Sequence, residues 1–153
     1  MKTIQQWYDD YAVSHQNKTN QKIHYICVPA IFFSIVGMIM SIPSGFLQKT
    51  LGIANPMLGN WASVLLVLLL LFYLRLSFSL FLRMLGFSIL CVMGNYYLGK
   101  YLPLFTTSLI IFIVAWIGQF YGHKIEGKKP SFFKDLQFLL IGPAWVFEKL
   151  SRS

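Results

Sequence analysis

The sequence predicts an all-α fold: a polytopic membrane helix bundle in a single membrane domain, residues 1–153, with about four transmembrane helices and interfacial helices at both ends. Of its residues 56% are hydrophobic and 12% are charged, whereas about a quarter of the residues in a soluble domain are charged. Residues 11–125 contain no carboxylate, and the mean hydropathy of the chain is +0.60. These values exclude an ordinary soluble domain.

Four segments approach the length of a transmembrane helix, which needs about 20 predominantly apolar residues. They are residues 23–42, 61–82, 84–101 and 103–122. The first ends at Pro43-Ser44-Gly45, and a connection rich in Gly, Asn and Pro precedes the second. The second and third segments share almost no loop, which predicts a tight hairpin around Arg83.

The two ends of the chain are expected to lie on one face of the membrane. Residues 1–22 are polar and predict an interfacial helix over 3–14 followed by a turn, while residues 131–150 predict an interfacial or re-entrant helix interrupted by Gly142-Pro143. Four spans place every Lys and Arg except Lys49 and Lys100 on the side of the termini. The positive-inside rule then predicts cytoplasmic termini, and we expect a bacterial inner membrane as the host.

The net charge of +8 is explained if the basic residues face the anionic headgroups of membrane lipids, so no nucleic-acid partner is expected. A homo-oligomer is compatible with the sequence, which does not fix the oligomeric state.

The chain has three histidines, His15, His24 and His123, and all three fall at the cytoplasmic ends of predicted spans. His15 and His24 are nine residues apart, about 900° of helical turn, so one unbroken helix would point them in opposite directions. Asn17 and Asn20 favour a turn between the two histidines, with a new helix from residue 19 or 20. Asn20 then precedes His24 by one turn, where its amide is expected to orient the imidazole.

At the other end of the bundle, Gln119, His123 and Glu126 follow one stripe of a helix. Gly118 and Gly122 beside them allow a second backbone or a substrate to approach closely. Two or three imidazoles with one carboxylate favour a non-haem iron(II) site over a structural zinc site, which prefers thiolates. The spacing of these residues alone leaves four other interpretations open. The histidines could simply bind lipid headgroups at the interface, or the protein could be a haem protein, a small carrier or channel, or a non-catalytic membrane protein with a structural metal.

Two blocks of residues resemble the signature blocks of the Mpo1-like family of small four-span membrane proteins. The first is His15-Gln16-Asn17, Asn20, Ile23-His24 and Pro29, and the second is Gln119-Phe120-x-Gly122-His123-x-x-Glu126-Gly127-x-x-Pro130. The resemblance extends over nearly the whole chain, including Gly142-Pro143 and Glu148. The chain departs from the pattern at Cys27 and at Ser131-Phe132, and neither position is a proposed ligand.

The resemblance implies an iron(II)-dependent dioxygenase that uses O₂ for the α-oxidation of 2-hydroxy fatty acids to a product one carbon shorter. The residues implied as metal ligands are His15, His24, His123 and Glu126. Beside them, we expect a supporting or substrate-binding role for Asn17, Asn20, Gln119, Lys128 and Lys129. The lysines would pair with the substrate carboxylate at headgroup level, although lysines that simply anchor the chain to lipid explain them equally well.

Overall fold

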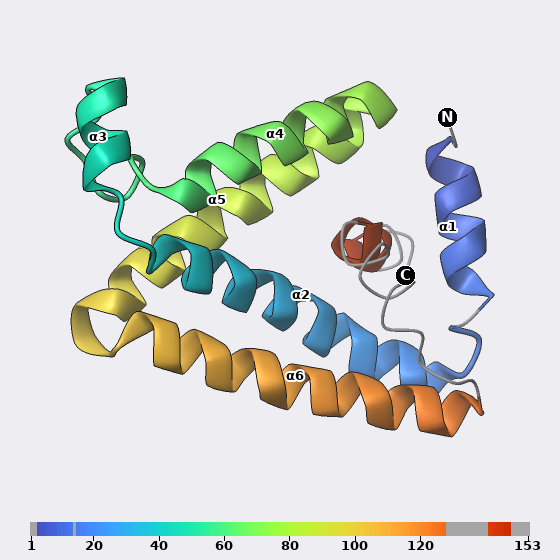
Figure 1. Ribbon diagram of the computed structural model, residues 1–153. Helices are drawn as coiled ribbons and strands as arrows, with labels where there is room; N and C mark the ends of the chain where they lie inside the picture. The colour runs from blue at the N-terminus through green and yellow to red at the C-terminus, as the bar shows by residue number, and fades with distance from the viewer. Residues whose placement is uncertain (1–2, 14, 128–140, 148–153) are drawn as a thin grey trace. The chain divides into compact units, whose positions relative to one another are not determined.

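A computed structural model describes residues 3–13, 15–127 and 141–147 (Figure 1). Lys128, Lys129, Glu148 and most of the segment 131–150 lie outside the described residues. The described chain is helical and contains no strand, which confirms the all-α prediction. Its helices are α1 (Ile4–Ala12), α2 (Lys18–Met40), α3 (Gly45–Leu51), α4 (Trp61–Leu76), α5 (Phe78–Tyr101) and α6 (Leu104–Glu126), and residues 141–147 are also helical.

Three of these helices, α2, α5 and α6, are long and apolar enough to cross a membrane. Helix α4 is apolar but has only 16 residues, about 24 Å of helix against a hydrocarbon core of about 30 Å. The described helices are therefore compatible with an integral membrane protein that has three candidate spans. A fourth span is not established.

The predicted hairpin around Arg83 is wrong, because the chain breaks six residues earlier, at Ser77. Ser77 has an extended backbone, with φ −168° and ψ 134°. Its N–H donates to Tyr73 O at 2.9 Å and its carbonyl accepts from Phe81 N at 2.9 Å, so one helix ends and the next begins at the same residue. Arg83 lies inside α5. Apolar residues continue on both sides of the break, so hydropathy alone did not place it.

The connection after the first span contains a short helix that the sequence pattern did not predict. Helix α3 ends at Leu51, and Gly52 after it has a left-handed φ of 66°, a conformation that glycine adopts without strain. The Gly-, Asn- and Pro-rich segment that follows is a connection, as predicted, and it ends where Asn60 Oδ1 accepts from Ser63 N at 3.0 Å. That bond caps the first turn of α4.

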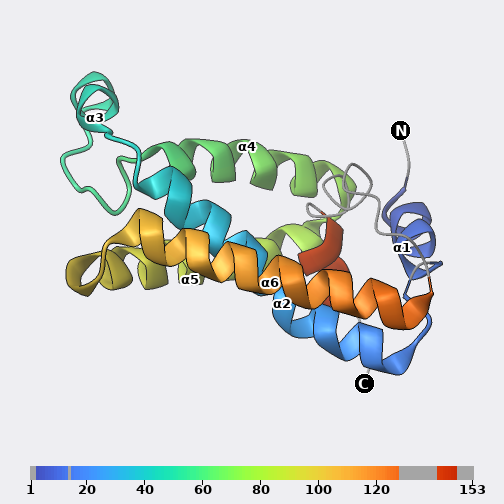
Figure 2. The same cartoon turned by 60° about the horizontal axis from the view of Figure 1, so that its bottom comes forward.

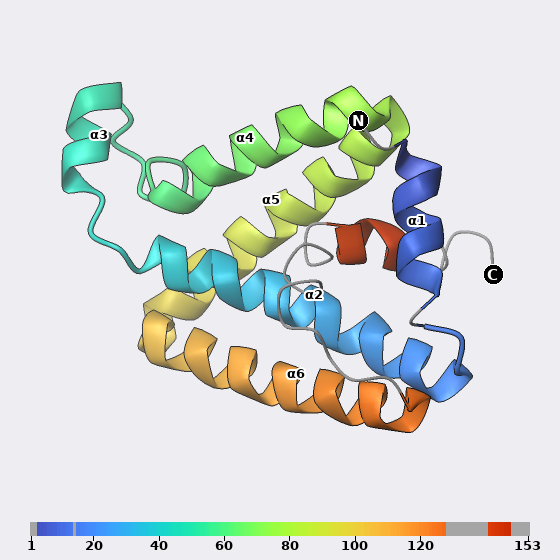
Figure 3. The ribbon, with the colours of Figure 1, turned by 45° about the vertical axis from the view of Figure 1, so that its right-hand side comes forward.

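The chain divides into two compact units, Met1–Phe32 with Ile111–Ser153, and Phe33–Ile110. In the second unit α4 packs on α5 (Figure 2), and α5 contributes the buried Asn95, whose amide donates to Phe33 O at 3.0 Å. In the first unit, the N-terminal part of α2 and the C-terminal part of α6 lie side by side (Figure 3). The first unit holds all three histidines.

Candidate metal centre

The structure brings His15, His24 and His123 together in one buried cluster. Each side chain is at most 3% exposed, and one ring nitrogen from each lies within 4.8 Å of the other two. The ring centroids are 4.3 Å apart for His15 and His24, 5.1 Å for His24 and His123, and 5.6 Å for His15 and His123. Imidazoles from the two ends of the sequence therefore lie close enough together to share one ligand.

The break between α1 and α2 is what allows His15 to meet His24. Helix α1 ends at Ala12, and His15 N donates to Ala12 O at 3.0 Å in the turn that follows. Asn17 Oδ1 then accepts from Thr19 N at 2.8 Å, which caps the start of α2. The predicted break is confirmed, and α2 begins at Lys18.

The His24 ring is held in the orientation that a metal ligand needs. Its Nδ1 lies 2.9 Å from the backbone carbonyl of Asn20. Because a carbonyl only accepts, Nδ1 carries the hydrogen and the lone pair lies on Nε2. That Nε2 atom is buried and has no hydrogen-bond partner among the described residues. The sequence predicts that the side-chain amide of Asn20 orients this ring, but the backbone carbonyl of the same residue does so instead.

Glu126 lies outside the cluster of ligand atoms that the three histidines form. Its Oε1 accepts from Gln16 N at 3.0 Å, and its Oε2 accepts from Asn17 N at 2.9 Å and from Asn20 Nδ2 at 3.0 Å. Asn17 and Asn20 thus contact Glu126 directly, while Gln119 is buried on α6 one turn before His123. No described contact assigns a role to Gln119.

Glycines let α2 and α6 approach closely at the site, as the sequence predicted. A methyl group at Gly118 would lie 2.7 Å from Cys27 Sγ. A methyl group at Gly122 would overlap Asn20 Oδ1 and would lie 3.5 Å from His24 Cε1. A side chain at either position would force the facing side chain of α2 to move.

Sequence reasoning missed Trp145, which comes from the described helical residues 141–147. Its indole lies 5.7 Å from the His15 ring and packs in a buried cluster with Val28 and Val146, against which Tyr8 of α1 also packs. Tyr8 Oη donates to Ala144 O at 3.4 Å. The only signal in the sequence was one tryptophan after Gly142-Pro143.

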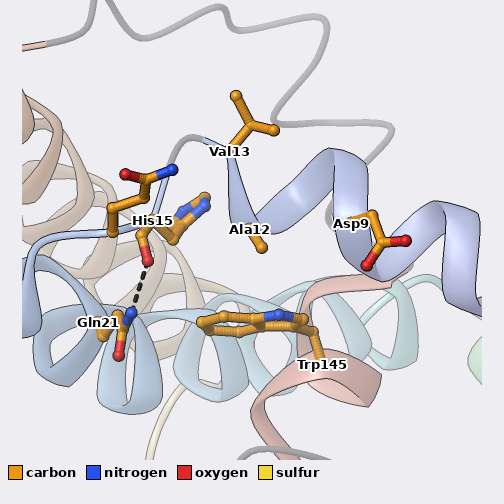
Figure 4. Close-up of a pocket in the computed structure, with 7 residues that line it drawn as sticks. Asp9, Ala12, Val13, His15, Gln21 and Trp145 are labelled. Carbon is orange, nitrogen blue, oxygen red and sulfur yellow. Dashed lines mark hydrogen bonds between the residues drawn. The ribbon is translucent and has the colours of Figure 1, made fainter.

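A cavity of about 400 Å³ adjoins the cluster at His15 (Figure 4). Figure 4 shows Asp9 and Ala12 of α1, and Val13 just after that helix, along one side, with Gln21 and Trp145 along another. Gln21 Nε2 donates to the His15 carbonyl at 2.6 Å. The cavity thus has both polar and aromatic walls and reaches one of the three imidazoles.

The residues of the cluster fit a transition-metal ion. Three imidazoles offer neutral nitrogen donors, which suit zinc, copper, iron or nickel. The orphaned Nε2 of His24 is explained if a metal takes its lone pair, because a buried polar atom otherwise requires a hydrogen-bond partner. Cys27 and Cys91 are free thiols outside the cluster, so the described site lacks the thiolates that favour structural zinc.

Comparison with known proteins agrees with the resemblance described above. The family described as "Mpo1-like: 2-hydroxy-palmitic acid dioxygenase Mpo1-like" matches residues 1–153. No curated protein and no solved structure matches the chain. The family match covers the full length of the chain and includes the three histidines of the cluster. The chain belongs to the Mpo1-like family.

Proposed function

We propose that the protein is an iron(II)-dependent dioxygenase that carries out α-oxidation of 2-hydroxy fatty acids to the acid one carbon shorter. The observation that carries this proposal is the buried cluster of His15, His24 and His123, whose ligand nitrogens lie within 4.8 Å of one another. These imidazoles would hold the iron. The family description supplies the substrate class and the type of reaction.

Iron(II), when bound, supplies the redox chemistry that lets O₂ react with an organic substrate. His15, His24 and His123 would hold the iron, and a 2-hydroxy acid offers its carboxylate and hydroxyl oxygens as a chelating pair for it. The overall reaction balances with no additional reductant: R–CHOH–COOH + O₂ → R–COOH + CO₂ + H₂O. Four electrons leave the substrate and one O₂ accepts all four.

The chain's own residues would bind the substrate and shield it from water. The cavity that His15 lines would admit the substrate, and the flat indole of Trp145 beside it suits an alkyl chain. Burial of the three imidazoles keeps bulk water away from the reacting end. Lys128 and Lys129, outside the described residues, remain proposed partners of the substrate carboxylate.

The same proposal places the enzyme in a bacterial inner membrane as one membrane domain, with its site at the cytoplasmic face. The basic residues near both termini favour this orientation. A lipid-like substrate would then reach the site from the membrane leaflet that faces the cytoplasm.

The decisive experiment combines metal analysis with oxygen consumption. Purified protein in detergent should contain iron and should take up one O₂ for each 2-hydroxypalmitate, with release of one CO₂. Palmitate and 3-hydroxypalmitate are the matched controls, because neither can chelate through adjacent carboxylate and hydroxyl groups. Iron without oxygen uptake would refute the dioxygenase and favour a structural metal, and absence of any bound metal would favour a carrier or channel.

A further inference from the structure

Glu126 anchors the loop that carries His15. The carboxylate accepts two backbone hydrogen bonds, from Gln16 N at 3.0 Å and from Asn17 N at 2.9 Å. A third bond, from Asn20 Nδ2 at 3.0 Å, ties it to the first turn of α2. Both carboxylate oxygens are therefore engaged by the segment that immediately follows His15.

The same loop is fixed from a second direction. Gln21 Nε2 donates to the His15 carbonyl at 2.6 Å, and Asn17 Oδ1 accepts from Thr19 N at 2.8 Å. The backbone on both sides of the His15–Gln16 peptide bond is thereby tied to α2 and α6. Such ties limit the conformational freedom of a short connection that would otherwise sample many positions for the His15 ring.

Glu126 is linked to all three histidines of the cluster, either by hydrogen bonds or by its position on the same helix. It lies one helical turn after His123 on α6, and it binds the amide that follows His15. Through Asn20 it reaches His24, because the Asn20 backbone carbonyl accepts from the His24 ring. One carboxylate thus joins the three chain segments that supply the imidazoles.

Physical chemistry favours this arrangement. Hydrogen bonds to an ionised carboxylate are shorter and stronger than those between neutral groups. The carboxylate also lies beside the first turn of α2, where the partial positive charge of the helix N-terminus stabilises an anion. The structure offers these donors to Glu126, whereas it places the carboxylate outside the cluster of ligand atoms.

We propose that Glu126 is a positioning residue, a latch that holds His15 against His24 and His123, and that it is not a metal ligand. The latch itself is a property of the metal-free chain. Its consequence for metal binding rests on the proposed function.

The latch is tested first without metal, by amide hydrogen exchange at Gln16 and Asn17 in the full-length protein. In E126Q the neutral amide has one acceptor oxygen in place of two charged ones, so exchange at these amides should accelerate about tenfold or more. K124Q is the matched control, because Lys124 is exposed on the same turn of α6. E126D keeps the carboxylate and should restore part of the protection.

Metal binding supplies the second test, with Co(II) as the probe because its absorption bands report the ligand set. A latch predicts that E126Q binds Co(II) about tenfold more weakly, with the wild-type spectrum at saturation. A changed spectrum at saturation would identify Glu126 as a ligand and overturn the proposal. Unchanged exchange at Gln16 and Asn17 in E126Q would overturn it as well.

The two proposals fail in different ways. If wild-type protein binds no Co(II) or iron, the metal-dependent function fails while the exchange experiment still decides whether the latch exists. If E126Q does not fold, E126D decides instead. It should bind Co(II) with an affinity between those of wild type and a histidine variant, and a wild-type exchange pattern with an altered spectrum would overturn the latch.

Discussion

Replacing Gly122 with alanine should weaken metal binding, although Gly122 carries no ligand atom. The added methyl group would overlap Asn20 Oδ1, lie 3.4 Å from Asn20 Cγ and lie 3.5 Å from His24 Cε1. The overlap is relieved only if the Asn20 side chain turns away or if α2 moves away from α6 at this point. The first change breaks the Asn20–Glu126 hydrogen bond, and the second also displaces His24.

The expected magnitude follows from two opposing terms. Overpacking of this kind costs about 1–3 kcal/mol, while alanine is favoured over glycine inside a helix by about 1 kcal/mol. The net penalty on folding is therefore up to about 2 kcal/mol. The helix preference acts alike on the metal-free and the metal-bound protein, so the overpacking cost alone sets the expected loss of affinity, about 5-fold to 150-fold for Co(II) or iron(II).

The assay is an anaerobic Co(II) titration in detergent, accompanied by thermal unfolding of the metal-free protein. G86A is the matched control, because a methyl group at Gly86 of α5 would meet no atom within 4 Å. G86A should bind Co(II) like the wild type. Wild-type affinity in G122A, or an equal loss in G86A, would refute the reasoning from close packing at the site.

Three further predictions concern other parts of the chain. H24A should lose bound metal and oxygen uptake, because the orphaned Nε2 would be gone, and metal retained at the wild-type level would remove this ligand from the proposal. A12W should fill the cavity beside His15, so oxygen uptake with 2-hydroxypalmitate should be slower while Co(II) binding stays unchanged. The control is I117W, at an exposed position of α6, which should leave the rate of oxygen uptake unchanged. G37A should lower the unfolding temperature, corresponding to about 1–3 kcal/mol, because its methyl group would overlap both Asn95 Oδ1 and Ser108 Oγ; an unchanged unfolding temperature would contradict that contact.

The general class of the fold and the meeting of the histidines could be predicted from the sequence. Apolar composition requires membrane-type helices, and the asparagines between His15 and His24 require a break that lets the two rings converge. Both conclusions depend on properties of residues that are close together in the sequence, namely their hydrophobicity and their tendency to form turns. The break at Ser77 could not be predicted in this way, because leucine and phenylalanine continue on both sides of it.

The role of Glu126 could not be predicted either, for a different reason. Helical periodicity correctly put Glu126 on the stripe of His123, and residue type then suggested a ligand. The groups that it contacts are backbone N–H groups of Gln16 and Asn17, which no side-chain pattern reveals. Trp145 escaped prediction in the same way, because its contact with His15 joins segments that are 130 positions apart in the sequence.

The placement of Glu126 also bears on which substrates the site would accept. If Glu126 binds the loop after His15 and no metal, the proposed ligands are three neutral imidazoles, and an iron(II) ion held by them would keep its full double charge. An anionic chelating substrate is then attracted more strongly than a neutral diol or alcohol of the same length, because charges interact strongly where water is excluded. The proposed site would therefore select 2-hydroxy acids by charge as well as by chelation. A variant that moves a carboxylate into the cluster, such as His15→Asp, should weaken binding of the 2-hydroxy acid more than binding of the neutral 1,2-diol, and equal losses for both compounds would contradict selection by charge.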